Sequence, residues 1–244
     1  MFPPAVAMII DHPRPGVVRL TLNRPDVLNA IDWQTLADLE AEIEKAEADP
    51  AMRVLIVTGA GDRAFCSGAD LNIIRDLDGE AIREWAVAGH RAFGRLAAGR
   101  LPSIAAIHGY CLGGGLELAL SCDLRLAAAD AAFGSPELQH GWIPGWGGIP
   151  MLSCIVGEGR ARDIVMTGER LAAEDAWQIG LCRRPVPVRH LESASLDLAE
   201  RVGALKPVAL GALKAMLPGG PPEPGSAASE LEIEALQEQL AAAR

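Results

Sequence analysis

The chain has 244 residues, half of them hydrophobic, and carries 32 acidic against 22 basic residues for a formal net charge of −10. This length allows one substantial buried core, and the acidic balance argues against nucleic acid as a partner. Five scattered cysteines without a Cys/His cluster, no membrane-length apolar stretch and no signal-peptide pattern predict a cytoplasmic protein without a bound metal or a membrane partner.

The first predicted elements alternate between strand and helix. Residues 17–22 are apolar and β-branched and are stopped by a proline at position 25, which predicts a strand. Asp32 is suited to cap a following helix whose apolar side chains recur every three or four residues. The unbroken apolar run 54–58 is typical of a strand that is buried on both faces.

The segment after this run, 59–64, fits a loose dinucleotide-binding pattern of glycines. That pattern requires a helix directly after it, but residues 65–70 have no sustained helical period. We interpret 59–64 as a plain turn and keep nicotinamide binding as the weaker alternative. Residues 67–71 are small and flexible, and they allow either an ordinary glycine turn or the approach of a ligand carbonyl to the amide of Ala69.

The alternation continues with a helix at about 80–96 and with strands at 103–107 and 124–127. Strands that alternate with helices indicate an α/β fold with mostly parallel pairing. From about Gly147 onward helical segments dominate, at about 147–156, 158–167, 173–179, 190–205, 207–216 and 227–243, with a Gly/Pro-rich turn at 219–225.

Three consecutive glycines at 113–115 open the helix that follows the strand at 103–107. Glycine in a helix costs roughly 1 kcal/mol relative to alanine, so the run indicates tight packing or close approach of another group to bare N–H groups. Glu117 follows among leucines with no basic residue nearby in sequence. It is either a simple first-turn acid or, since apolar surroundings raise a carboxyl pKa, a proton carrier.

A second carboxylate lies in Ser135-Pro136-Glu137, which reads as an N-cap, a first-turn proline and a first-turn acid. That pattern alone explains Glu137 without any chemistry. Its surroundings favour a site, because the glycine-rich segment 145–148 follows before another predicted helix and can place a ligand or water against backbone N–H groups. His140 lies three residues from Glu137 and is a weaker candidate for the same pocket.

Taken together, these segments resemble the enoyl-CoA hydratase/isomerase (crotonase) superfamily over most of the chain. Each piece alone is moderately specific, and their order and spacing are highly specific. The matching pieces are 22–25 with 28–30, 64–71, 108–118 with 122–123, 133–148, and 171–176 with 180–181.

The resemblance implies that the N–H groups of Ala69 and Gly114 hold the carbonyl oxygen of an acyl-CoA thioester, as an oxyanion hole. Glu117 and Glu137 match the two glutamates that hydratases of the family place around the attacking water. Because CoA is anionic and the chain acidic, we expect local neutralisation of its phosphates by Arg24 and Arg63. The substrate-binding candidates are Ala69, Asp70, Leu71, Asn72, Gly114, Gly145 and Trp146.

The family fold is a spiral of repeated ββα units with a helical C-terminal region. We therefore predict a crotonase-like α/β core with the CoA-thioester site over residues 1–190, and a helical oligomerisation region over 191–244. The resemblance also implies a trimer or a dimer of trimers, an acyl-CoA thioester as substrate, a place in fatty acid metabolism, and no cofactor apart from the CoA of the substrate.

The chain departs from the family at three places. Trp146 stands where a small residue is usual, Ile149 and Pro150 replace polar residues, and the last predicted helix reaches Arg244, earlier than is usual in the family. The acyl pocket is therefore expected to be reshaped. The alternatives to a hydratase are an enoyl-CoA isomerase or other enolate-stabilising enzyme with one working glutamate, and a non-catalytic acyl-CoA binding protein.

Overall fold

The structure, a computed structural model, describes residues 6–217 and 220–242 and contains two sheets. The first sheet consists of β1 (Met8–Arg14), β2 (Val17–Leu22), β3 (Val54–Gly59), β5 (Ser103–Ile107) and β7 (Leu124–Ala127), in that order. The second consists of β4 (Ala64–Cys66), β6 (Tyr110–Leu112), β8 (Ala132–Gly134) and β9 (Leu171–Ala172), also in that order.

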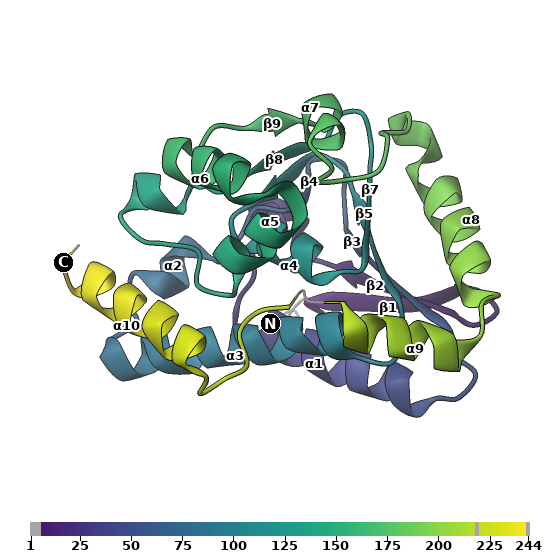
Figure 1. Ribbon diagram of the computed structural model, residues 1–244, viewed down its shortest axis with the longest axis horizontal. Helices are drawn as coiled ribbons and strands as arrows, with labels where there is room; N and C mark the ends of the chain where they lie inside the picture. Colours follow the sequence, from purple (N-terminus) through teal and green to yellow (C-terminus); the bar gives the residue numbers. More distant parts are fainter. Residues whose placement is uncertain (1–5, 218–219, 243–244) are drawn as a thin grey trace, which may run out of the picture.

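Helices surround these sheets (Figure 1). The α-helices are α1 (Trp33–Ala48), α2 (Leu71–Ile74), α3 (Gly79–Ala98), α4 (Gly114–Ser121), α5 (Gly148–Val156), α6 (Glu158–Thr167), α7 (Ala173–Gln178), α8 (Leu191–Gly203), α9 (Pro207–Met216) and α10 (Ala227–Ala242). The described residues also form three short 3-10 helices, which are η1 (Pro25–Val27), η2 (Glu137–His140) and η3 (Val188–His190).

The two sheets are built by a repeat in the chain. Strands β2, β3, β5 and β7 pair in parallel, as do β4, β6 and β8, whereas β1 and β9 join their sheets antiparallel. Each of β3, β5 and β7 is followed by a short strand of the second sheet and then by helical structure. The predicted spiral of ββα units with a helical C-terminal region is therefore confirmed.

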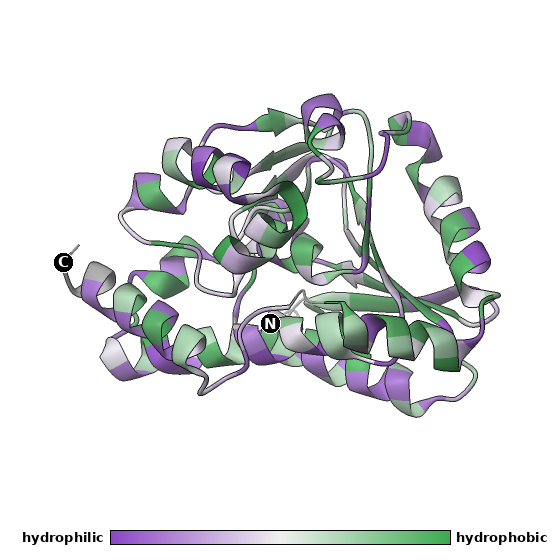
Figure 2. Ribbon diagram, viewed as in Figure 1, coloured by the Kyte–Doolittle hydropathy of each residue, from purple (hydrophilic) through white to green (hydrophobic). Residues whose placement is uncertain are grey.

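Strand β3 shows why the first sheet is sandwiched between helices. Its side chains alternate between two apolar clusters, so Leu55 and Val57 pack on one side and Val54 and Ile56 on the other. Buried residues of α1 and α3 belong to the first cluster and buried residues of α8 to the second. Figure 2 shows the resulting hydrophobic interior strands beside helices of mixed polarity. This is the burial on both faces that the unbroken apolar run predicts.

The C-terminal helices are tied to the rest of the chain by polar contacts that are buried or partly buried. Lys214 on α9 donates to the carboxylate of Asp123 and to two backbone carbonyls. Helix α10 lies along α3 (Figure 1), where Arg83 pairs with Glu230 and His90 with Glu232. The boundary between a core and an oligomerisation region at residue 190 stays a prediction. In the two described ranges, no helix combines the length and apolar character that a membrane crossing requires.

Candidate active site

A cavity of about 420 Å³ lies where the loops after β4 and β6 meet the turn before α5, with walls from α3 and α10. It brings together segments that are far apart in the sequence. Of the residues singled out from the sequence, those lining it are Ala69, Asp70, Leu71, Asn72, Gly114, Glu117, Glu137, His140, Gly145 and Trp146.

Two backbone amides converge at one end of this cavity. Ala69 follows β4 and Gly114 is the first residue of α4, and a β-carbon added to Gly114 would lie 3.4 Å from the nitrogen of Ala69. Across the parts of the chain that the structure describes, neither amide donates a hydrogen bond to another protein group. Two unpaired N–H groups beside each other, one at a helix N-terminus, are suited to hold a negatively polarised oxygen.

Each glycine of the run 113–115 leaves room for a different neighbouring group. Gly113 has φ +53° and gives room to Glu137, whose Oε1 would lie 3.0 Å from an added β-carbon. At Gly114 the neighbour is the indole of Trp146, and at Gly115 an added β-carbon would collide with the backbone carbonyl of Cys66. The close approach that the sequence predicted is therefore present at all three glycines.

Glu117 lies in the first turn of α4 and is 4% exposed. Its Oε1 accepts hydrogen bonds from the N–H groups of Trp146 and Gly148, both at 2.8 Å. Burial raises its pKa well above 4.5, and the charges of Glu137 and Glu232 raise it further, while the two amides oppose this. Glu117 is thus held in place by two donors, and its burial makes it bind a proton more tightly than an exposed glutamate does.

Glu137 is 7% exposed and lines the same cavity. Its Oε2 accepts a hydrogen bond of 2.7 Å from the hydroxyl of Ser135. Burial raises the pKa of Glu137 as well, with the Ser135 hydroxyl acting in the opposite direction. Two neighbouring carboxylates with raised pKa values titrate as a pair and can divide the roles of acid and base.

The prediction that a helix capped by Ser135 begins at this point is wrong. Residues Glu137–His140 form only the 3-10 helix η2, which ends at Gly141 with φ +88°. Ser135 does not cap a backbone amide, because its hydroxyl instead binds the carboxylate of Glu137. The pattern therefore identified the acid but assigned it to the wrong local structure.

Trp146 closes one wall of the cavity and is 3% exposed. Its ring centroid lies 5.2 Å from those of Trp85 and Phe93 on α3. Its indole also occupies the space beside Gly89, where any β-carbon would overlap it. The large residue is therefore accommodated because α3 and α4 each present a glycine to it.

Neither arginine predicted to meet phosphates lines the cavity. Arg24 pairs with Asp32 at 3.2 Å and with Asp70 at 2.9 Å, so carboxylates already match its charge. Arg75, which sequence reasoning missed, is exposed at the end of α2 and does line the cavity. Within the described residues Arg75 pairs with no carboxylate, and its only sequence signal is a basic residue just after the segment 69–72.

Three further residues of the site are not apparent from the sequence. Trp85 from α3 and Leu236 from α10 line the cavity, and Glu232 from α10 lies behind it against Gly147. They come from helices distant in sequence from the glycine loops, so no local pattern connects them. Over residues 6–217 and 220–242, no group of three or more His, Cys, Asp or Glu side chains is placed to hold a metal ion.

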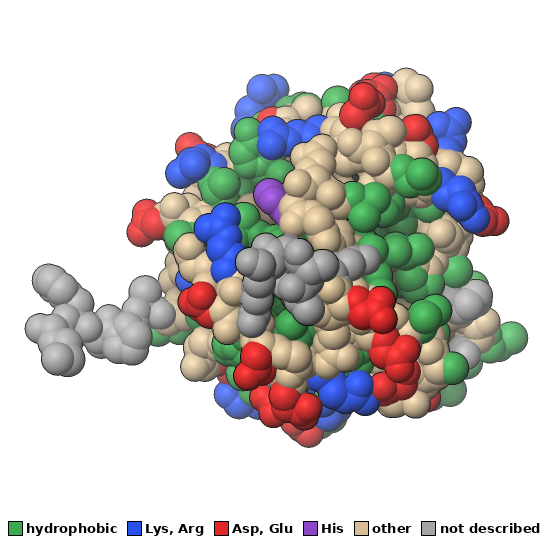
Figure 3. Space-filling view, turned by 90° about the vertical axis from the view of Figure 1, so that its left-hand side faces the viewer, with side chains coloured by type: hydrophobic (Ala, Val, Ile, Leu, Met, Phe, Trp, Pro, Cys, Tyr) green, Lys and Arg blue, Asp and Glu red, His purple; other side chains and the backbone are tan. Residues whose placement is uncertain are grey.

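The face seen in Figure 3 has an uneven distribution of charge. Acidic side chains are most numerous over its lower part, where a few basic side chains lie among them, and both kinds are scattered over the upper part.

The sequence and the fold both have known relatives. The sequence model of the enoyl-CoA hydratase/isomerase family matches residues 13–243. A short-chain-enoyl-CoA hydratase of Clostridium acetobutylicum is 37% identical over 194 residues, which cover 80% of this chain and 74% of that protein. A crotonyl-CoA hydratase of Syntrophomonas wolfei is 38% identical over 183 residues, covering 75% and 70%. A crystal structure of an enoyl-CoA hydratase from Bacillus anthracis superposes with a TM-score of 0.83 at 35% identity, over 86% of this chain and 81% of that one.

Proposed function

Because the chain belongs to the enoyl-CoA hydratase/isomerase family, we propose that it catalyses the reversible addition of water to the double bond of a 2-enoyl-CoA thioester. One observation carries the proposal. The amides of Ala69 and Gly114, which donate to no protein group among the described residues, line the same cavity as two buried carboxylates with raised pKa values, Glu117 and Glu137.

In this proposal the thioester carbonyl oxygen accepts hydrogen bonds from the two amides. Water lies between Glu117 and Glu137, and one carboxylate takes a proton from it while the oxygen bonds to the β-carbon. Electrons of the double bond move toward the carbonyl oxygen, where the amides stabilise the enolate. The other carboxyl then gives its proton to the α-carbon, which restores the carbonyl. Removal of one such donor costs about 3–4 kcal/mol in other enzymes.

The substrate is proposed to be an acyl-CoA, with Ala69–Asn72 along the CoA moiety and Arg75 near its anionic part. The reaction as written needs no cofactor beyond the substrate, since the acids and amides of the chain perform every step. A homo-oligomer and a cytoplasmic location stay predictions from the sequence, which light scattering and fractionation can test.

Incubation with crotonyl-CoA tests the function directly, by loss of the absorbance of the conjugated thioester. We expect hydration, because relatives at 37–38% identity are named for short-chain and crotonyl substrates. Absence of hydration across a series of acyl lengths would contradict the proposal. Double-bond migration without hydration would favour the isomerase, and binding without turnover would favour a non-catalytic acyl-CoA binder.

A further inference from the structure

Three consecutive amides in the turn before α5 are divided between two buried carboxylates. The N–H groups of Trp146 and Gly148 donate to Glu117, both at 2.8 Å. Between them, the N–H of Gly147 points to a different acid and donates to Oε1 of Glu232 at 3.3 Å. Glu232 therefore binds the middle of the turn whose two ends hold Glu117.

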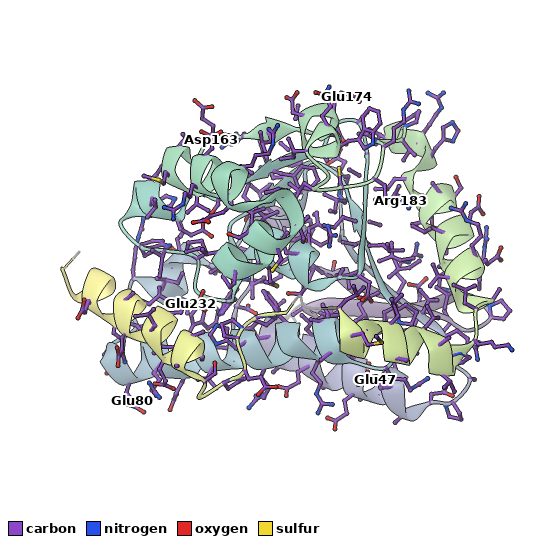
Figure 4. The ribbon with its side chains drawn as sticks, in the orientation of Figure 1. Glu47, Glu80, Asp163, Glu174, Arg183 and Glu232 are labelled. Carbon is purple, nitrogen blue, oxygen red and sulfur yellow. The ribbon has the colours of Figure 1, made fainter. Side chains whose placement is uncertain are left out.

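Glu232 is itself fixed by a buried network that joins α10 to α3. Its Oε2 lies 2.7 Å from Nε2 of His90, and Nδ1 of His90 lies 3.1 Å from the hydroxyl of Ser229. The relative exposures of Ser229, His90 and Glu232 are 0%, 1% and 8%. Figure 4 shows Glu232 on the side of α10 that faces the rest of the molecule. Buried polar groups with this degree of satisfaction specify one arrangement of the elements that they connect.

We infer that Glu232 is a positioning residue for hydration, which holds the Gly147 amide so that the neighbouring amides keep the Glu117 carboxylate in place. This rests on the proposed function, in which Glu117 transfers a proton. Glu232 does not line the cavity, so it acts through the turn and not on the substrate. A displacement of about 1 Å in a catalytic group can cost about 100-fold in rate.

The charge of Glu232 acts on the same carboxylate. It raises the pKa of Glu117, after the larger contributions of burial and of Glu137, and the amides of Trp146 and Gly148 lower it. His90 is a further titratable group, and it is in direct contact with Glu232. A substitution at Glu232 therefore has to separate the lost charge from the lost hydrogen-bond acceptor.

Glu232→Gln and Glu232→Met make that separation. In Glu232→Gln, the amide oxygen can still accept from Gly147 while the NH₂ group donates to Nε2 of His90, whose Nδ1–H then donates to Ser229. Glu232→Met has a similar volume but no strong acceptor. Glu230→Ala is the matched control, because Glu230 also joins α10 to α3, through Arg83, without contacting the turn.

The test measures hydrogen exchange of individual amides by NMR on the full chain, together with kcat and KM for crotonyl-CoA. In Glu232→Met we expect the amides of Trp146 and Gly148 to exchange at least about tenfold faster, and kcat to fall between about 10- and 100-fold with KM within about threefold. Glu232→Gln and Glu230→Ala should stay within about threefold of the wild type in both readouts.

Unchanged exchange in Glu232→Met, or equal effects in Glu230→Ala, would overturn the inference. If Glu232→Met does not fold by circular dichroism, Ser229→Ala provides a milder test, since it removes only the hydroxyl that orients His90. Faster exchange at the same two amides is expected there, and no change overturns the inference. If even the wild type fails to hydrate any thioester, the proposed function falls, while the exchange data still decide whether Glu232 holds the turn.

Discussion

A β-carbon added to Gly114 would lie 2.5 Å from Cζ3 of Trp146 and 2.9 Å from Cε3. The indole is thus in direct contact with the residue whose amide is proposed to bind the thioester oxygen. Because the indole packs against Trp85 and Phe93, it cannot move away from Gly114 without disrupting these contacts. Substitutions at these two positions should therefore depend on each other.

Gly114→Ala is expected to lower kcat/KM for crotonyl-CoA by about 100-fold or more, because the added methyl group displaces the first turn of α4 and one of the two amides. Gly159→Ala is the control, since an added β-carbon there meets nothing within 4 Å. In the double variant Gly114→Ala with Trp146→Ala, the decrease in Tm should be smaller than the sum of the decreases in the two single variants. Strict additivity would mean that the two residues do not clash.

Trp146→Ala is expected to shift the preferred substrate toward longer acyl chains, because it opens space beside the proposed thioester position. Each additional methylene that becomes buried is worth about 0.8 kcal/mol, or roughly fourfold in kcat/KM. A series of 2-enoyl-CoA thioesters measures this effect, with Trp146→Leu as the milder variant. Trp33→Ala removes an indole that contacts Trp85 without lining the cavity, and should leave the profile unchanged.

Glu117→Gln and Glu137→Gln should each lower kcat by about 100- to 10,000-fold, since each removes one partner in proton transfer. The steady-state rate of crotonyl-CoA hydration is the measurement. Glu158→Gln, on an exposed side chain of α6, is the control. Retention of full activity in both variants would mean that the two carboxylates have a structural role and take no part in proton transfer.

The raised pKa of Glu117 predicts how its substitution changes stability with pH. A carboxyl whose pKa is higher in the folded state stabilises the protein most below its unfolded pKa, near 4.5. That contribution is lost as the pH rises through the folded pKa. The Tm of Glu117→Gln minus that of the wild type should thus be larger at pH 8 than at pH 5. An equal difference at both values would contradict the raised pKa.

Arg75→Ala is expected to raise KM for crotonyl-CoA about three- to tenfold with little change in kcat, because Arg75 carries a positive charge at the cavity and pairs with no carboxylate among the described residues. High salt should shrink the difference. A pantetheine thioester, which lacks the nucleotide, should show none. The same assay on Arg24→Ala and Arg63→Ala tests whether those two predicted residues contact phosphates.

Regular elements with strong apolar patterns were predictable from sequence. The helix at 158–167 has the predicted bounds, and Asp32 accepts from the N–H of Thr35 as an N-cap should. Strands β4, β6 and β8 have three residues each, which is too short for any periodicity to be apparent. Only the resemblance to the family implied them.

The candidate site was predictable where it depends on backbone and local sequence. The glycines and Glu117 belong to one short segment, and their chemistry follows from residue type and order. The contact of His90 with Glu232 joins positions 142 residues apart, and the neighbours of Trp146 come from a helix that no local pattern connects to it. Such contacts arise from tertiary packing, for which a single sequence holds no local signal.

The position of α10 along the chain bears on when a nascent polypeptide becomes active. Leu236 lines the cavity and Glu232 binds the turn behind it, and both are synthesised after every strand of the two sheets. During translation the glycine loops and both carboxylates therefore emerge from the ribosome before the helix that supplies this part of the cavity wall. A growing chain lacks the wall that α10 contributes to the cavity until this helix has emerged and docked on α3.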